Sequence, residues 1–435
     1  MRSPRFVVLA VLAVAAAVRP AAAQTNFTRY VSIGDSLAAG VESNSLVETH
    51  QLRSVPALIA RQAGATDFQQ PLVSEPGIPP ELTLVTLIPA PFVAPKAPTS
   101  GEPKNAALGR PYNNLAVPGA TVDDALNRTT DAGGAHDLVL RGLGTQVAQA
   151  LSLRPTAITL WIGNNDVLGA AVRGRAVDGL TLTPAATFRA LYGQVVTALK
   201  TSGAFIVAAN LPDVSTIPFV TTIKPYVTNP STGAPVLVAG SRVPLIGPNG
   251  PLPSTAQVTI AASTLLAQGI GIPAALGGTG AGLPDEVVLD PTEIAMIQDR
   301  VNTNNQAIRE ICAAANIPVL DIHAIYAELS TTGRHLGGIT LTNSFLSGGV
   351  FSYDGVHPND VGYALVANEW IRVINERGGA LAPVDLGTVL GVGGASGGRM
   401  AASALRASTS RWVPFELSPD AYADLLAAFP TVDGR

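Results

Sequence analysis

Residues 30–40 read YVSIGDSLAAG, a short apolar strand that runs into a glycine-containing turn. Small residues suited to the start of a helix follow Ser36. Ser36 therefore stands at the carboxyl end of a strand, which is where open α/β sheets bind their ligands. A hydroxyl at a helix N-terminus also faces backbone N–H groups that suit a developing oxyanion. We interpret Ser36 as a nucleophile for which other segments supply a base and an oxyanion hole.

Strands and helices alternate along the rest of the chain. The continuous apolar run 156–162 is typical of a parallel strand buried on both faces, and 204–209 and 317–320 predict further strands. Helices are predicted over 55–61, after a Thr183 cap with Pro184 in the first turn, after the capping-box sequence 290–293, and over 364–374. This alternation predicts an α/β fold with a mostly parallel sheet covered on both sides.

Composition excludes several classes of function. The 435 residues are 47% hydrophobic and 13% charged, and the net charge of −4 gives no electrostatic basis for binding nucleic acid. The same charge argues against docking on an anionic membrane by charge alone. The single cysteine, Cys312, rules out an intrachain disulfide and a CxxC zinc site, and we expect it to be a core residue. No H-E-x-x-H motif or other ligand cluster in the sequence supports a zinc site. We expect no cofactor.

The N-terminus has the pattern of a secretory signal peptide. Arg2 and Arg5 precede the apolar run 6–18, and three alanines end at Ala23. This pattern predicts cleavage near Ala23 and a secreted or periplasmic protein, with an uncleaved N-terminal anchor as the alternative.

Two long segments and a tail interrupt the α/β pattern. We expect a signal peptide at 1–23, a folded domain at 28–377 with insertions near 71–112 and 215–288, and a C-terminal tail of unknown role at 378–435. The insertions are rich in Gly and Pro, and loops of that length are usually functional or mobile.

Serine-based ester cleavage needs a hydroxyl, an imidazole base, a group that orients the imidazole, and oxyanion donors. Ser36 supplies the hydroxyl, and His357 is the best base because it lies in a polar loop just before a helix. Asp354 stands three residues earlier, within reach of the imidazole. The backbone N–H of Gly119, the side-chain amide of Asn165 and the N–H of Ser36 complete an oxyanion hole.

These segments together resemble the GDSL esterase/lipase family of the SGNH hydrolase superfamily. The resemblance is carried in family order by Gly34–Leu37, Asn114–Thr121, Gly163–Asp166 and Asp354–His357. It implies a three-layer, flavodoxin-like sandwich, no metal, and hydrolysis through an acyl-enzyme.

Within the blocks, the resemblance implies that Ser36 is the nucleophile and that Asp354 and His357 are the acid and base. It implies Asn165 rather than Asn164 as the amide donor, with Asn164 as the alternative. Asp35 is expected to cap the turn and Asp166 to anchor its loop. The remaining histidines are expected to be satisfied surface or loop residues: His50, His136, His323 and His335.

The leading hypothesis is a secreted serine esterase or lipase that acts on a small-molecule or lipid ester. The Leu, Val, Ile and Pro content of the insertions suits an acyl pocket or a transient contact with a lipid surface. Two alternatives keep the same site, namely a carbohydrate O-deacetylase and an acyltransferase. A third is a non-catalytic secreted binding protein. No feature of the sequence specifies an oligomeric state.

Overall fold

The computed structural model describes residues 25–86, 91–229, 232–389 and 415–428. Its centre is a parallel sheet with the strand order β1-β4-β5-β12. The four strands are β1 (Tyr30–Gly34), β4 (Ala157–Trp161), β5 (Phe205–Ala209) and β12 (Val319–Leu320). Every residue of β1 and β4 is buried, which explains why their sequences are apolar runs rather than alternating patterns.

An irregular fifth strand extends the sheet beyond β1. The N–H of Ser32 donates to the carbonyl of Asn113 at 2.8 Å, and the N–H of Leu115 donates back to the carbonyl of Ser32 at 2.9 Å. Counted along the chain, the order is therefore 2-1-3-4-5, the flavodoxin-like arrangement. This order places the ends of β1, β4 and the segment after Leu115 at one edge of the sheet.

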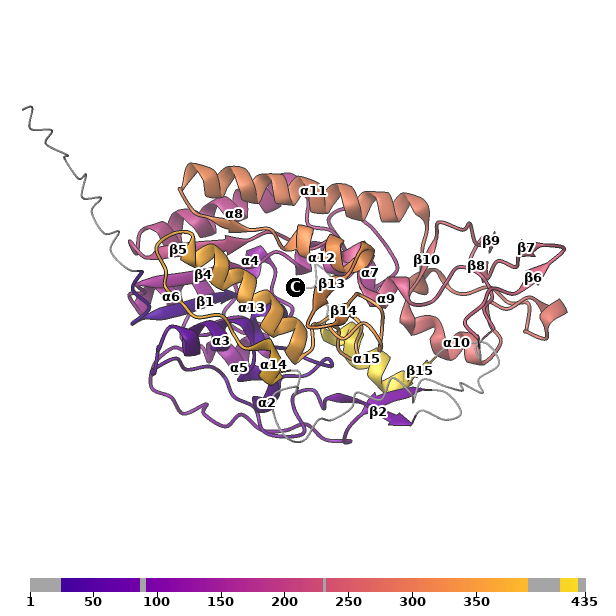
Figure 1. Cartoon of the computed structure of the whole chain (residues 1–435), viewed down its shortest axis with the longest axis horizontal. Helices are drawn as coiled ribbons and strands as arrows, with labels where there is room; N and C mark the ends of the chain where they lie inside the picture. Colours follow the sequence, from indigo (N-terminus) through magenta and orange to yellow (C-terminus); the bar gives the residue numbers. More distant parts are fainter. Residues whose placement is uncertain (1–24, 87–90, 230–231, 390–414, 429–435) are drawn as a thin grey trace, which may run out of the picture.

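Helices cover both faces of the sheet (Figure 1). On one face lie α4 (Val122–Asn127), α6 (Gln146–Ser152), α8 (Ala185–Lys200) and α11 (Pro291–Ala314). The other face is covered by α3 (Val55–Gln62) and α13 (Asp360–Asn375). The ring centroids of Trp161 on β4 and Trp370 on α13 lie 6.4 Å apart. The predicted three-layer α/β/α sandwich is confirmed.

One predicted helix start is wrong. Helix α8 begins at Ala185 after a Pro184 cap, and no side chain caps it. The N–H of Thr183 instead donates to the Asp166 carbonyl at 2.9 Å. The cap residue is therefore Pro184, one position later than the local sequence indicates.

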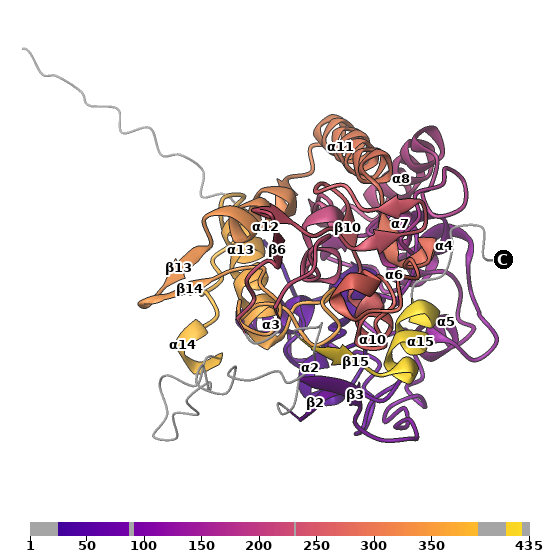
Figure 2. The same ribbon diagram turned by 90° about the vertical axis from the view of Figure 1, so that its right-hand side faces the viewer.

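The segments between the core elements carry short structure of their own. Strands β2 (Leu82–Thr86) and β3 (Phe92–Pro95) form an antiparallel pair, and β15 (Glu416–Leu417) joins β3 in parallel. Figure 2 shows β15 and the following α15 (Pro419–Ala428) beside β2 and β3. The C-terminal segment thus packs against the first long segment rather than lying apart from it.

Hairpins occupy much of the second long segment and project from one end of the molecule in Figure 1. The remaining strands are β6 (Leu237–Val238), β7 (Ser241–Arg242), β8 (Ile246–Gly247), β9 (Gly250–Pro251), β10 (Gln257–Val258), β11 (Val288–Leu289), β13 (Arg334–Leu336) and β14 (Ile339–Leu341). The remaining α-helices are α1 (Ser36–Ala39), α2 (Glu48–Gln51), α5 (Ala135–Leu140), α7 (Asn165–Val172), α9 (Pro218–Thr221), α10 (Ser263–Ala267), α12 (Ile322–Thr331) and α14 (Leu386–Val389).

Within the described ranges, no helix has both the length and the apolar character needed to cross a membrane. The predicted signal peptide, residues 1–23, lies outside the described residues. Cys312 is buried, with its sulfur 3.9 Å from the hydroxyl of Tyr192.

Candidate active site

Ser36 is the first residue of α1 and is 4% exposed. Asp35 caps this helix, because its Oδ1 accepts the N–H of Leu37 at 3.1 Å. The turn needs glycine at position 34, where a Cβ would lie 2.6 Å from both the Cβ of Ala38 and the carbonyl oxygen of Trp161. The sharp change from strand to helix therefore presents the Ser36 side chain at the carboxyl edge of the sheet.

Asp354 and His357 form a buried hydrogen-bonded pair. Asp354 Oδ2 lies 2.8 Å from Nδ1 of His357, and Oδ1 accepts the N–H groups of Val356 and His357 at 2.8 Å each. The side chains are 0% and 1% exposed, respectively. A ring that donates Nδ1–H to a carboxylate presents Nε2 as its acceptor, which is the form a general base requires.

The ionised form of Asp354 is stabilised in spite of its burial. Burial opposes ionisation, but the His357 ring and the backbone N–H groups of Val356 and His357 lower the pKa of Asp354 below its ordinary value. A further N–H, that of Asn44, donates to Asp354 Oδ2 at 2.7 Å. Asp354 therefore stays a carboxylate at neutral pH and can stabilise an imidazolium.

Residues of the third block, Gly163–Asp166, contact both the first block, Gly34–Leu37, and the second block, Asn114–Thr121. Asn164 Nδ2 donates to Asp35 Oδ2 at 2.7 Å, which fixes the cap in front of Ser36. Asn165 Nδ2 donates to the carbonyl of Ala120 at 3.0 Å, next to Gly119. Gly119 has a φ of +79°, a conformation that favours glycine.

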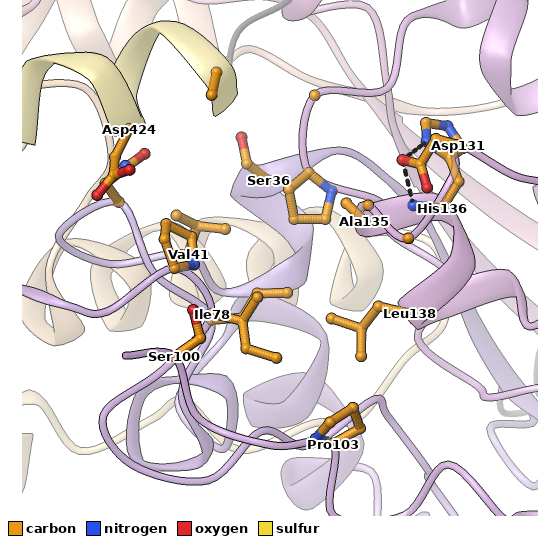
Figure 3. Close-up of a pocket in the computed structure, with 18 of the residues that line it drawn as sticks. Ser36, Val41, Ile78, Ser100, Pro103, Asp131, Ala135, His136, Leu138 and Asp424 are labelled. Atoms are coloured by element: carbon orange, nitrogen blue, oxygen red, sulfur yellow. Dashed lines mark hydrogen bonds and ion pairs between the residues drawn. The ribbon is translucent and has the colours of Figure 1, made fainter. Parts of the chain in front are cut away.

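A cavity of about 690 Å³ brings three of the predicted residues together, Ser36, Gly119 and His357. Figure 3 shows apolar side chains on one side of Ser36 and Asp424 of α15 across the cavity from Asp131. The apolar lining includes Val41, Leu46, Ile78, Pro103, Pro118 and Leu138. Asp354 reaches this cavity through His357. A second hollow of about 20 Å³ is lined by Ser36, His357 and Asn164.

Sequence reasoning missed several residues around the site. Asn44 supports Asp354 through its backbone, so its side-chain type carries no signal of this contact. Asp424 and Ala427 line the cavity from the C-terminal tail, whose position only the tertiary structure reveals. His136 is not a surface histidine: it is 3% exposed within α5, and its Nδ1 lies 3.0 Å from Asp131 Oδ2.

Asp166 is buried behind the site and predicts a pH effect on stability. Burial raises its pKa to about 7, although the Thr183 hydroxyl and the Val122 N–H favour the ionised form. In the unfolded chain Asp166 loses its proton near its ordinary pKa, whereas the folded chain keeps the proton up to about pH 7. Asp166 therefore increasingly destabilises the fold as pH rises toward 7. From pH 5 to pH 8, we expect the free energy of unfolding of Asp166→Asn to rise by on the order of 2–4 kcal/mol relative to that of the unmodified protein.

Urea unfolding of both proteins at the two pH values measures this difference. Asp213→Asn is the control, because Asp213 is a partly buried cap of a short helical turn and asparagine can cap that turn as well. Parallel stability curves for Asp166→Asn and the unmodified protein would contradict the raised pKa.

Comparison with known proteins identifies the family. The family model described as GDSL-like Lipase/Acylhydrolase matches residues 30–370. The chain therefore belongs to the GDSL-like lipase/acylhydrolase family, as its four blocks predict. No curated protein matches the chain.

Several solved structures resemble the fold at low identity. A lipase/acylhydrolase from Enterococcus faecalis is 15% identical over 82% of this chain and 99% of its own, with a TM-score of 0.34. The acetyl xylan esterase AlAXEase is 15% identical over 78% and 97%, with a TM-score of 0.32. An extracellular lipase from Streptomyces rimosus is 14% identical over 80% and 98%, with a TM-score of 0.33. At these TM-scores, the family model alone carries the assignment.

Proposed function

We propose that the protein is a serine ester hydrolase that cleaves acyl esters through an acyl-enzyme on Ser36. The observation that carries the proposal is the buried Asp354–His357 pair, whose ring lines the same cavity as Ser36. A binding protein would not need a carboxylate, an imidazole and a helix-start hydroxyl at one cavity.

In the proposed first step, Ser36 Oγ bonds to the acyl carbon while Nε2 of His357 takes the hydroxyl proton. The tetrahedral intermediate then collapses, the ester C–O bond breaks, and the imidazolium returns its proton to the leaving alcohol. Water attacks the acyl-enzyme in the second step, with His357 again as the base. The carboxylic acid leaves and Ser36 Oγ recovers its proton. Asp354 holds the ring and stabilises its charged form throughout.

The oxyanion of the intermediate would accept hydrogen bonds from the N–H groups of Ser36 and Gly119 and from Asn165 Nδ2. An amide has two N–H bonds, and the Ala120 carbonyl uses one of those of Asn165. The bond to Ala120 holds the side-chain amide of Asn165 close to the backbone next to Gly119. Donors held in place before reaction are the effective ones, because they cost no reorganisation when charge develops.

Asn165→Ala is expected to lower kcat by about 10²–10³-fold, the usual cost of one lost oxyanion donor. Asn164→Ala tests the alternative donor, and we expect a smaller loss because Asn164 Nδ2 is bonded to Asp35. Steady-state kinetics on a p-nitrophenyl acyl ester measures both. A larger loss in Asn164→Ala would exchange the two roles.

The cavity favours an acyl substrate with an apolar chain. Its volume lies within the range of small-ligand sites, and its lining beside Ser36 is mostly apolar. Charged side chains also line it, namely Arg128, Asp131 and Asp424. These groups favour, as a second candidate, an ester whose alcohol is a polyol or sugar.

A substrate panel tests the function and separates the two candidates. We expect hydrolysis of p-nitrophenyl esters to increase from acetate toward medium-length chains, with covalent labelling of Ser36 by a fluorophosphonate. Preference for acetylated sugars over every simple acyl ester would instead favour the deacetylase. A chain that neither hydrolyses esters nor takes the label would not be a hydrolase.

We also propose that the protein is exported. The support is the charged, apolar and small-residue pattern of residues 1–23. N-terminal sequencing of the mature protein tests it, with Gln24 as the expected first residue.

A further inference from the structure

A histidine, His50, lies among the carboxylates of Glu42, Glu81 and Asp360. Nδ1 of His50 is 3.1 Å from Glu42 Oε2 and 3.1 Å from Asp360 Oδ1. Its other nitrogen, Nε2, is 3.1 Å from Glu81 Oε1. The four residues come from separate parts of the chain: the loop after α1, helix α2, the segment before β2, and the first turn of α13. The family-type blocks do not include this cluster.

Among the described residues, hydrogen bonds leave one carboxylate oxygen of this cluster without a partner. Nδ1 carries at most one hydrogen, yet two carboxylate oxygens lie at equal distance from it. Glu42 Oε2 is fully buried and, although close to Nδ1, makes no hydrogen bond of good geometry.

We propose that His50 Nδ1, Glu42 Oε2 and Asp360 Oδ1 bind a divalent transition-metal ion, with Zn²⁺ as the expected occupant. The three atoms all lie within 4.8 Å of one another. Ligands at ordinary Zn–N and Zn–O distances stand about 3.4 Å apart in a tetrahedral site, so the 3.1 Å contacts need only a small expansion. One imidazole with carboxylates suits Zn²⁺ better than Ca²⁺ or Mg²⁺, which prefer all-oxygen sets.

The surrounding residues supply the outer support that such sites use. With Nδ1 on the metal, Nε2–H of His50 would donate to Glu81, which is the carboxylate–histidine–metal arrangement. Arg53 pairs with the second oxygen of Asp360 and so orients that ligand. Lys96 Nζ lies 3.5 Å from Glu81 Oε2 and limits the excess negative charge.

The proposed ion would have a structural role rather than a part in the reaction. The loop that begins with Glu42 continues to Ser43, whose N–H donates to Ser352 Oγ at 2.9 Å, and to Asn44, whose N–H supports Asp354. Asp360 stands three residues after His357. A metal would therefore tie the two segments that hold the triad acid and base.

Calorimetric titration of chelator-treated, full-length mature protein with Zn²⁺ tests the proposal without any activity assay. We expect one equivalent to bind and to raise Tm by a few degrees. Glu42→Gln should weaken binding at least about 100-fold, and Glu81→Gln about 10–100-fold. Glu75→Gln is the matched control, because Glu75 pairs with Lys96 at the surface outside the ligand set. Co²⁺ in place of Zn²⁺ should give the visible absorption of a tetrahedral site.

Three results would overturn the proposal. The first is the absence of saturable Zn²⁺ binding. The second is Zn²⁺ affinity that is the same in Glu42→Gln as in Glu75→Gln; should Glu42→Gln fail to fold, His50→Gln takes its place in this comparison. The third is tighter binding of Ca²⁺ or Mg²⁺ than of Zn²⁺. Because these measurements do not involve Ser36, they stand or fall independently of the hydrolase proposal.

Discussion

Ser36→Ala is expected to lower kcat for acyl-ester hydrolysis by about 10⁴–10⁶-fold while leaving the fold intact. The variant removes the only atom that forms the acyl bond in the proposed mechanism. It removes little packing, because the helix start keeps its Asp35 cap and its backbone N–H groups. Kinetics on a p-nitrophenyl ester, with circular dichroism and Tm on the same sample, measure both expectations. The variant should also lose fluorophosphonate labelling.

Ser100→Ala is the matched control, because Ser100 lines the same cavity away from the helix start (Figure 3). We expect its kcat to stay within a few-fold of that of the unmodified protein. If Ser36→Ala kept its activity and Ser100→Ala lost it, Ser100 rather than Ser36 would be the nucleophile.

Asp354→Asn is expected to lower kcat by about 10³–10⁴-fold, because the change alters which nitrogen of His357 carries the proton. An asparagine amide offers N–H as well as C=O where the carboxylate only accepts. The buried carboxylate also accepts the N–H groups of Asn44, Val356 and His357, so the amide would lose some of these bonds. The imidazolium formed during the reaction would lose its negative partner.

The catalytic and structural effects of Asp354→Asn can be separated. If the variant loses activity because it unfolds, its Tm is lowered and activity returns when the assay is run well below Tm. A catalytic loss persists at low temperature, where the variant is folded. Asp213→Asn removes a partly buried carboxylate outside the proposed triad, which accepts the N–H of Ser215 at 2.9 Å, and serves as the control. Full activity in folded Asp354→Asn would exclude Asp354 as the triad acid.

The fold was predictable because its signals are local. The apolar run of β4 needs burial on both faces, and the Asp290–Glu293 capping box marks the start of α11 within one turn. The order of the four blocks likewise predicts a family that the family model confirms. The roles of Ser36, His357, Asp354, Gly119 and Asn165 remain predictions for kinetics.

Contacts between distant segments were not predictable. Thr183 looks like a cap in sequence, but its N–H bonds the carbonyl of Asp166 and Pro184 is the cap residue. Glu42, His50 and Asp360 have no shared spacing, since the fold brings together positions more than 300 residues apart. A sequence motif can reveal a metal site only when its ligands recur at fixed short intervals, and these do not.

The contribution of α15 to the cavity matters for anyone who shortens this gene for expression. The family model ends at residue 370, so a version trimmed to its limits would keep all four blocks. It would lose Asp424 and Ala427, which line the cavity beside Ser36, and also the last five residues of α13. If the protein is an ester hydrolase as proposed, we expect the selectivity of such a truncated version to misrepresent that of the full-length protein, because the cavity has lost part of its lining.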